Sequence, residues 1–405
     1  MKHYYFWTVF VVIFVVELYS VLPPRNVTLP KENLSSSRNF AQGVIHVHSK
    51  FSDGGGTPEE IAQAADQAGL DFVIVTDHNN YEARKRGLEG TYGKADLFVE
   101  MESSTPVGHT VSFFSESDSL REAPSDTVVK ASYQQFLKKE FYPGLFVSIA
   151  HPSNMKNPWS RLDEFAEGLE VVNFDSSWQR QVAESPLNFL FTLAIYPFNQ
   201  YLSSIRFLEI YSKDFVAWDE MTSRGPGHFA YLAQDTHSKV KLNNERSLEW
   251  PGYLQTFKLA SNVLLFKEPK ATDFLNRKKQ YYSSLRNGRS AILYQSVFPY
   301  QGNSWIVKCG NNEFISGDII NNGSSSCQAV ITAPITPFTK IVRLIKNGKM
   351  TNEVALKGDS MTPLNLALSG EGTYRVEVWG KMHSAFRLTL NRLVPYVFYS
   401  PIYFQ

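Results

Sequence analysis

Cysteine is scarce in this sequence, which has only Cys309 and Cys327 among 405 residues. Two thiols cannot build a four-cysteine zinc site or a disulfide-dense scaffold. An excess of charge is also missing, because 40 Lys and Arg residues stand against 39 Asp and Glu residues. This balance gives no evidence for sequence-specific nucleic-acid binding. A hydrophobic share of 43% excludes a disordered chain, and the length suggests two or three domains at roughly 100–200 residues each.

A hydrophobic run long enough to cross a membrane is missing as well. The N-terminal run Tyr4–Val16 has 13 apolar or weakly polar residues, and Glu17 interrupts it. A spanning helix needs about 20 residues, whereas a run of this length is typical of a signal sequence. Three interpretations stay open: an uncleaved signal anchor or a cleaved signal peptide within residues 1–24, or a buried N-terminal helix. Residues 25–42 are polar and predict a linker, and we expect the folded part to lie outside the cytoplasm.

Two regions of different texture follow the linker. Residues 43–295 alternate short β-branched runs with helical segments, which predicts a parallel sheet, open or closed into a barrel. One helix has a clear start, because Thr57 and Glu60 form a capping box around Pro58. Helices are also expected near 126–140, 207–223 and 270–287. Residues 296–405 carry strand-like runs separated by Gly, Asn and Ser turns, which predicts a small all-β sandwich domain. Its strands are expected near 304–308, 327–333, 340–346, 372–379 and 385–390.

Two further features depend on the compartment and on packing. Export would favour a disulfide between Cys309 and Cys327, which lie 18 residues apart on neighbouring strand candidates. The segment 186–202 is strongly apolar but too short to span a bilayer. We interpret it as a buried or lid helix, with contact to a membrane surface as the alternative.

The histidines are the most informative residues. Six of the nine lie in short clusters at or just past the ends of predicted strands, together with carboxylates. The clusters are His46-x-His48 followed by Asp53, Asp77-His78, Glu102 with His109, His151-Pro152, and Asp235-x-His237. Residues i and i+2 of a strand point to the same side, so His46 and His48 can hold one ion, as can Asp235 and His237.

Imidazole and carboxylate donors without thiolate suit Zn, Mn or Fe. Each cluster alone has an ordinary structural explanation, such as a packed histidine or a strand-end cap. Five of them at strand ends, where loops converge in α/β folds, predict a site for two or three ions. Such ions lower the pKa of water and so generate hydroxide, and they stabilise charge on phosphoryl or acyl oxygens.

These residues resemble the motifs of the polymerase and histidinol phosphatase (PHP) family. The first two motifs are matched by His46-Val-His48-Ser-Lys-Phe-Ser-Asp53-Gly and Thr76-Asp77-His78-Asn79. The others are matched by Glu102 with Gly108-His109, Ala150-His151-Pro152 and Asp235-Thr236-His237. The five motifs occur in the order of the family and span about residues 43–240.

The resemblance implies a distorted (β/α)7 barrel with up to three metal ions. Carried over residue by residue, it groups the ligands in three sets: His46, His48, Glu102 and Asp235; Glu102 as a bridge with His109 and His151; and Asp53, His78 and His237. Glu100 is the alternative to Glu102, since it lies two residues earlier and is expected to face the same way. The family cleaves phosphomonoesters, nucleotides and oligonucleotide ends.

The sequence therefore predicts a membrane-anchored or exported PHP-type metal-dependent phosphoesterase that uses metal-activated hydroxide, with Zn or Mn as cofactor. The expected substrate is a small-molecule or nucleotide phosphoester. Lys50 and Arg246 are candidate phosphate contacts, although solvated loops explain both. No protein general acid is visible. Hydrolysis of a carbamate or carboxyl ester on the same metals is the first alternative, and a non-catalytic metal-containing binding module is the second.

Overall fold

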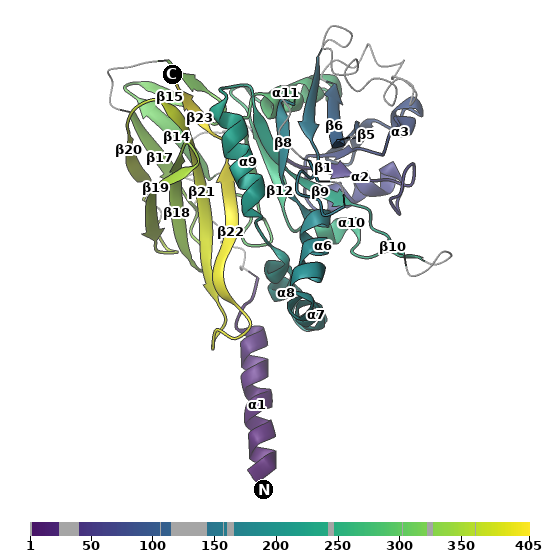
Figure 1. Cartoon of the computed structure of the whole chain (residues 1–405), viewed down its shortest axis with the longest axis vertical. Helices are drawn as coiled ribbons and strands as arrows, with labels where there is room; N and C mark the ends of the chain where they lie inside the picture. Colours follow the sequence, from purple (N-terminus) through teal and green to yellow (C-terminus); the bar gives the residue numbers. More distant parts are fainter. Residues whose placement is uncertain are drawn as a thin grey trace.

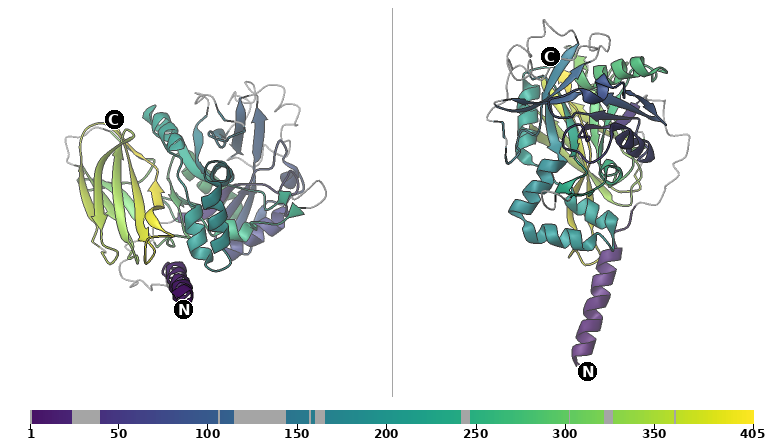
Figure 2. Two further views of the ribbon diagram at one scale, coloured as in Figure 1. Left: turned by 60° about the horizontal axis from the view of Figure 1, so that its bottom comes forward. Right: turned by 90° about the vertical axis from the view of Figure 1, so that its right-hand side faces the viewer.

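The computed structural model describes residues 2–23, 40–105, 107–114, 144–156, 158–159, 166–241, 247–301, 303–321, 327–360 and 362–405. Two parts lie side by side, an α/β part (residues 40–293) and a β part (residues 304–404), and the N-terminal helix α1 (Lys2–Tyr19) projects from them (Figures 1 and 2). The helix expected near 126–140 and the candidate residue Arg246 lie outside the described residues.

The α/β part is built on one run of paired strands. Parallel pairs join β4, β2, β1, β9, β8 and β7 in that order, and antiparallel pairs then join β7, β6 and β5. Only Glu100 separates β4 from β5 along the chain. The bounds of these strands are β1 (Phe40–Val47), β2 (Phe72–Val75), β4 (Ala95–Val99), β5 (Met101–Thr105), β6 (Gly108–Phe114), β7 (Leu145–Ile149), β8 (Gly168–Asn173) and β9 (Phe229–Thr236).

Helices follow several of these strands. Helix α2 (Pro58–Gln67) begins at the predicted capping box, in which Thr57 accepts a hydrogen bond from the Glu60 amide and Glu60 accepts one from the Thr57 amide. Its buried Ile61, Ala62 and Ala65 pack against β2 and β4. The other helices are α3 (Glu82–Lys85), α6 (Phe174–Glu184), α7 (Pro186–Ile195), α8 (Gln200–Phe207), α9 (Ser212–Ser223), α10 (Tyr253–Phe257) and α11 (Phe274–Arg286).

The expected alternation of strands and helices is interrupted at two places. Strands β5 and β6 form a hairpin with only two residues between them, so no helix connects them. Strands β12 (Ser261–Leu265) and β13 (Ser290–Leu293) are antiparallel to each other, and β12 also pairs with the start of β1. The helix expected near 207–223 is α9, which begins only at Ser212, because α8 ends at Phe207 and the residues between the two are not helical.

The β part consists of two sheets around a shared apolar core that includes Trp305, Val307, Val342 and Val376. One sheet has the order β15-β14-β17-β20, and the other joins β19, β18, β21 and β22. Strand β22 also pairs with β13, so the second sheet continues into the α/β part. The strands are β14 (Ser304–Cys309), β15 (Asn312–Phe314), β17 (Cys327–Thr332), β18 (Thr339–Lys346), β19 (Lys349–Leu356), β20 (Leu364–Leu368), β21 (Gly372–His383) and β22 (Asn391–Tyr399). Short pieces complete the strand set: β3 (Gly90–Tyr92), β10 (Val240–Lys241), β11 (Ser247–Leu248), β16 (Ile319–Ile320) and β23 (Ile402–Phe404).

Two local predictions in the β part have clear outcomes. The disulfide is confirmed, because Cys309 and Cys327 lie directly opposite each other in the antiparallel pair β14–β17 and are bonded. The prediction of a strand at 385–390 is wrong. These residues form the turn between β21 and β22, whose amides and Ser384 bind Glu17 rather than a neighbouring strand.

The two apolar segments are both helical. Among the described residues, no helix combines the length and the apolar character that crossing a bilayer requires. The segment 186–202 contains α7 and the start of α8, with Thr192 and Ile195 buried but Leu187 and Leu190 exposed. The segment expected to be a buried or lid helix is therefore two helices, of which α7 is only partly buried.

Candidate metal centre

The nine predicted ligands converge at the carboxyl ends of the parallel strands of the α/β part. His46 and His48 come from β1, His78 follows β2, His151 follows β7, and Asp235 and His237 come from the end of β9. Glu102 and His109 belong to the hairpin β5–β6. The side chains meet around the buried carboxylate of Glu102.

A β-bulge positions His46. The register of β1 shifts between Ile45 and Val47 against both neighbouring strands, and His46 has a φ of 67°. A bulge re-aims a side chain, so the pairing of His46 with His48 does not follow from simple strand alternation as we expected. Their Nε2 atoms lie 3.1 Å apart. They lie 3.2 and 3.3 Å from Oε2 of Glu102, and 3.5 and 3.2 Å from Oδ1 of Asp235.

Glu102 reaches two groups of histidines with its two oxygens. Its Oε1 lies 2.8 Å from Nδ1 of His109 and 2.8 Å from Nε2 of His151. Its Oε2 is turned to His46 and His48 and lies 3.0 Å from Nδ1 of His78. The Glu102 carboxylate thus contacts one group of imidazoles with each of its oxygens.

Glu100 does not share this position. Its Oε1 lies 2.9 Å from Nη2 of Arg84 and accepts a hydrogen bond of 2.7 Å from Tyr282. Lys278 lies 3.5 Å from the same oxygen. The expectation that Glu100 and Glu102 face the same way is wrong, because β4 ends at Val99 and β5 begins at Met101, so Glu100 lies at a break between two strands.

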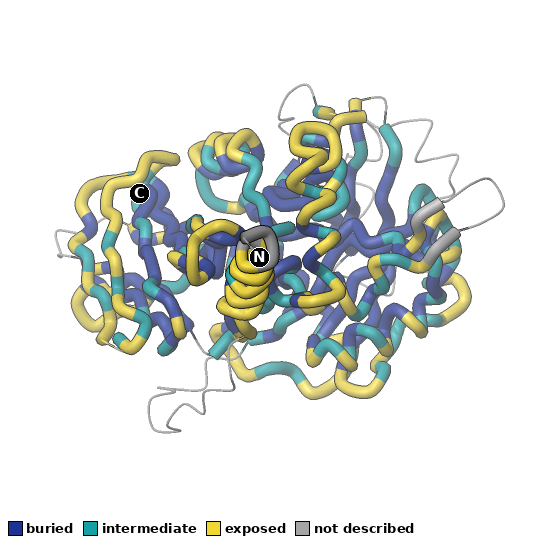
Figure 3. The backbone as a smooth tube through the Cα atoms, turned by 90° about the horizontal axis from the view of Figure 1, so that it is seen from below, coloured by how far each residue is buried: buried dark blue, intermediate teal, exposed yellow. Residues whose placement is uncertain are grey.

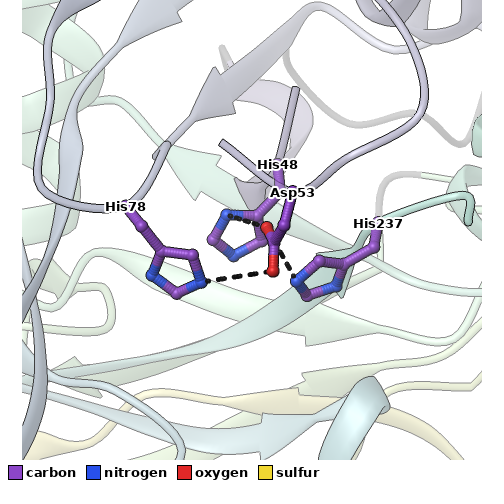
Figure 4. A group of neighbouring side chains, drawn as sticks. All are labelled: His48, Asp53, His78 and His237. Atoms are coloured by element: carbon purple, nitrogen blue, oxygen red, sulfur yellow. Dashed lines mark ion pairs between the residues drawn. The ribbon is translucent and has the colours of Figure 1, made fainter. Parts of the chain in front are cut away.

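Asp53 forms a third group with His78 and His237 (Figure 4). Its carboxylate oxygens lie 3.3 Å from Nε2 of His237 and 3.7 Å from Nε2 of His78. His48 also borders this group, since its Nδ1 lies 3.8 Å from Asp53. Asp53 is 48% exposed, so this group is the one most open to solvent.

Glycines allow the Asp53 loop to fold back over the strand ends. A Cβ at Gly54 would lie 2.1 Å from the carbonyl oxygen of His48. The amide of Gly55 donates to the carbonyl of His237 at 2.8 Å. Only glycine fits so close to a neighbouring backbone. The loop therefore brings Asp53 to His78 and His237 from a different part of the chain.

The electrostatics of the centre reflect this crowding. Burial raises the pKa of Glu102, but the charges and hydrogen bonds of His46, His109 and His151 outweigh it and hold the pKa well below the usual value. Burial lowers the pKa of His48 and of His151, but hydrogen bonds and charge from Glu102, and from Asp235, outweigh it and raise these pKa values to about 10 and about 9. Glu102 is therefore ionised, and these two imidazoles hold their protons firmly when no metal is bound.

The donors present fit divalent metal ions. Oε2 of Glu102 and Nδ1 of His78 are buried, 3.0 Å apart, and neither makes a hydrogen bond within the described structure. A buried polar atom without a partner is costly, and a cation held between such atoms satisfies them. Three sets of donors lie close enough to share an ion: His48, Asp53, His78 and His237; His46, His48 and Glu102; and His78, Glu102 and His109.

Sequence reasoning missed Glu170, which lies behind the ligands. Its Oε1 lies 2.5 Å from Nδ1 of His46 and accepts a hydrogen bond from Tyr231. Its Oε2 accepts hydrogen bonds from the amide of His151 and from Asn173, and Asn173 also donates to Asp235 at 3.0 Å. A signal was present in the sequence, because Glu170 is a charged residue within the otherwise apolar run Leu169–Val172.

Asp77 and Lys50 lie near the centre but are not among its nine predicted ligands. Asp77 accepts hydrogen bonds from the amide of Ser49 and from the hydroxyls of Ser49 and Ser52, so it braces the loop that carries Asp53. Lys50 is exposed on the same loop.

One comparison with known proteins identifies a domain within the chain. Residues 45–176 match the model of the PHP domain, a stretch that contains every predicted ligand except Asp235 and His237. No curated protein matches significantly. Among solved structures, a two-domain protein from Bacteroides vulgatus that contains a predicted PHP-like metal-dependent phosphoesterase is 13% identical, covering 93% of this chain and 99% of that one, with a TM-score of 0.41. A proposed metal-dependent phosphoesterase from Bifidobacterium adolescentis is 15% identical, covering 54% and 96%, with a TM-score of 0.26.

Proposed function

We propose that this chain is a metal-dependent hydrolase of phosphoesters. The observation that carries the proposal is the convergence of six imidazoles on the carboxylates of Asp53, Glu102 and Asp235. The match of residues 45–176 to the PHP domain supports it. Imidazole and carboxylate donors suit Zn or Mn, and their number suits two or three ions.

Each group of residues has a role in this proposal. His46, His48 and Asp235 would hold one ion, His109 and His151 a second, and Glu102 would bridge the two. Asp53, His78 and His237 would hold a third. When bound, the ions would supply hydroxide at neutral pH and neutralise the oxygens of a phosphoryl group.

Neighbouring residues of the chain orient these ligands and exclude water from the buried side of the centre. Glu170 fixes the ring of His46 so that Nε2 faces the centre, and burial of His46, His48 and Glu102 excludes water from one side. The exposed side, at Asp53, is where a substrate would enter. Lys50 on the same loop is proposed to contact the substrate, and Arg246, outside the described residues, keeps the same proposed role.

The remaining parts of the proposal concern the wider chain. We propose that β1, β2 and β4 to β9 form the distorted (β/α)7 barrel of a catalytic domain at 43–295, followed by a sandwich domain at 296–405. The substrate would be a small-molecule or nucleotide phosphoester. The disulfide supports a location outside the cytoplasm, because such bonds persist in oxidising compartments.

A substrate panel tests the reaction class. The full chain is stripped with EDTA, reloaded with Mn or Zn, and assayed on p-nitrophenyl phosphate, bis-p-nitrophenyl phosphate, p-nitrophenyl acetate and a p-nitrophenyl carbamate. We expect metal-dependent release from the phosphoesters and a loss of at least about a hundredfold in Glu102→Gln, whereas Glu59→Gln, half-buried in the first turn of α2 and not among the ligands, has no effect. Turnover of only the carbon esters would favour the carbamate or carboxyl ester alternative. Bound metal without any turnover would favour the binding module.

A further inference from the structure

Helix α1 exposes apolar side chains on every side. No charged residue occurs from Tyr4 to Val16. The exposed residues cover all directions around the helix axis, since consecutive positions are included: Trp7, Val9, Phe10, Val11, Val12, Phe14, Val15 and Val16. Helix α1 extends away from the body (Figure 1), and in the view along its axis most of its described length is coloured as exposed (Figure 3).

The C-terminal end of α1 is held in a polar socket formed by the turn between β21 and β22. Glu17 is 1% exposed, and its carboxylate accepts hydrogen bonds from the amides of Phe386, Leu388 and Thr389 at 2.6 to 2.8 Å. The hydroxyl of Ser384 also donates to it.

A second contact ties the same end to the α/β part. The side-chain amide of Asn199 donates to the carbonyls of Leu18 and Val21, at 2.6 and 2.8 Å. Asn199 also caps α8 by accepting from the amide of Leu202. These carbonyls lie where the helix ends, and such groups need a partner when buried.

The contacts of the socket indicate that α1 is not cleaved from the rest of the chain. Removal of the helix would leave the amides of Phe386, Leu388 and Thr389 and the side chain of Asn199 without these acceptors. A buried donor that loses its partner destabilises the fold. A segment that is cut off after export has no need of such a fitted contact, so the structure favours the anchor over the cleaved signal peptide.

Exposed apolar residues lie on the two elements next to the base of α1. Leu388 and Phe386 lie on the socket turn and are 70% and 52% exposed, and Leu187 on α7 is 82% exposed. Helix α7 lies beside the point where α1 leaves the body (Figure 1). Arg206 joins the two sides, because it donates to the carbonyl of Thr389 and to the hydroxyl of Thr192 on α7. We call Leu187, Phe386 and Leu388, with neighbouring Leu190 and Phe198, the base patch.

We propose that α1 and the base patch bind a lipid bilayer, with α1 inserted and the base patch resting on the surface. A helix that docks in a protein groove needs only one apolar face. Helix α1 is apolar on all sides, which suits a helix surrounded by lipid chains. Its apolar section from Tyr5 to Val16 is about 18 Å long, deep enough to enter the hydrocarbon region. Glu17 would then set the depth, because the socket holds it at the level of the base patch.

Vesicle flotation tests this proposal on the full chain. The chain is mixed with phosphatidylcholine vesicles and centrifuged through a density gradient. We expect the chain to float with the vesicles and a variant lacking residues 1–22 to stay behind. The double variant Leu187→Ser, Leu388→Ser should partition at least about tenfold more weakly, because two exposed leucines lose their contact with lipid. A brominated lipid should quench a share of the tryptophan fluorescence that Trp7→Phe lacks.

A matched control uses an exposed apolar residue far from the base patch. Met350 on β19 is 56% exposed and lies opposite Ile345, which pairs with Arg375 near the start of β21, whereas the socket turn follows the end of β21. Met350→Ser should therefore float like the unchanged chain. Three results would each overturn the proposal: a mature chain whose intact mass lacks residues 1–22, a chain that ignores vesicles, or one that forms a defined oligomer through α1 without lipid and does not float.

Discussion

The Oε1 atom of Glu170 lies 2.5 Å from Nδ1 of His46, and both side chains are fully buried. The other nitrogen of the same ring, Nε2, lies 3.2 Å from Glu102 and 3.5 Å from Asp235. A carboxylate behind an imidazole fixes the tautomer and the direction of the ring and increases the basicity of the nitrogen that faces the metal. Glu170 therefore acts on the centre through His46.

Substitution of Glu170 should weaken metal binding without removing a ligand. Glu170→Gln removes the negative charge but keeps the shape of the side chain, and we expect metal affinity to fall about 10- to 100-fold. Competition with a fluorescent chelator measures this. Glu184→Gln on the exposed end of α6 is the control and should bind like the unchanged chain. An unchanged affinity in Glu170→Gln would show that His46 needs no partner behind it.

The number of ions can be tested at Asp53. Asp53→Asn should lower the metal content by about one ion per chain and leave the others. The reason is that Asp53 is a proposed ligand only in the group of His78 and His237. Glu102→Gln should lower it more, because Glu102 faces two groups. Elemental mass spectrometry of matched samples decides this. If Asp53→Asn keeps its full metal content and activity, Asp53 is a turn residue and the third group is not a metal site.

Metal uptake should release protons. The pKa values of about 10 for His48 and about 9 for His151, set by Glu102 and Asp235 against the effect of burial, mean that both rings are protonated in the metal-free protein at pH 7 to 8.5. Each ring must lose its proton to bind a metal, so affinity rises with pH. Because His48 and His151 belong to the groups of two different ions, the proton of each ring predicts about a tenfold increase per pH unit in the affinity for its own ion in this range. Calorimetry in buffers of different ionisation enthalpy counts the protons, and a count of zero would contradict these pKa values.

The disulfide should stabilise the β part without affecting the metal centre. Replacing Cys309 and Cys327 by Ala should lower the free energy of unfolding by about 3 kcal/mol, because the bond closes a short loop in the unfolded chain. Thermal unfolding with and without reductant measures the effect. Metal content should stay the same, because both cysteines lie on β14 and β17, away from the strands that carry the ligands. A reductant-insensitive unfolding transition would contradict the prediction.

The types and order of the ligands were readable from the sequence, because strand ends and short His and Asp spacings are local features. The position of His46 was not, because it depends on a bulge that two neighbouring strands impose on β1. The same limit applies to Glu100 and Glu102. Their separation of two residues predicts a common face only within one strand, and the chain breaks its strand between them.

Contacts between distant segments were beyond sequence reasoning. Glu17 interrupts an apolar run and predicts only a boundary, and its partners at 384–389 are more than 360 residues away. The apolar and polar alternation at 385–390 predicted a strand, but these residues turn so that their amides can meet the Glu17 carboxylate. The role of Glu170 likewise depends on a contact between distant segments. It becomes visible only when β8 pairs with β9 and Glu170 reaches His46.

A metal titration that follows binding and catalysis in the same samples tests the central claim most directly. The stripped full chain is titrated with Mn while bound ions and hydrolysis of bis-p-nitrophenyl phosphate are measured at each step. We predict no activity in the stripped chain and a rise that follows the second bound ion, because Glu102 joins two groups of ligands. Hydrolysis that persists in the stripped chain, or a chain that binds no ion, would contradict the claim that these nine residues form a catalytic metal centre.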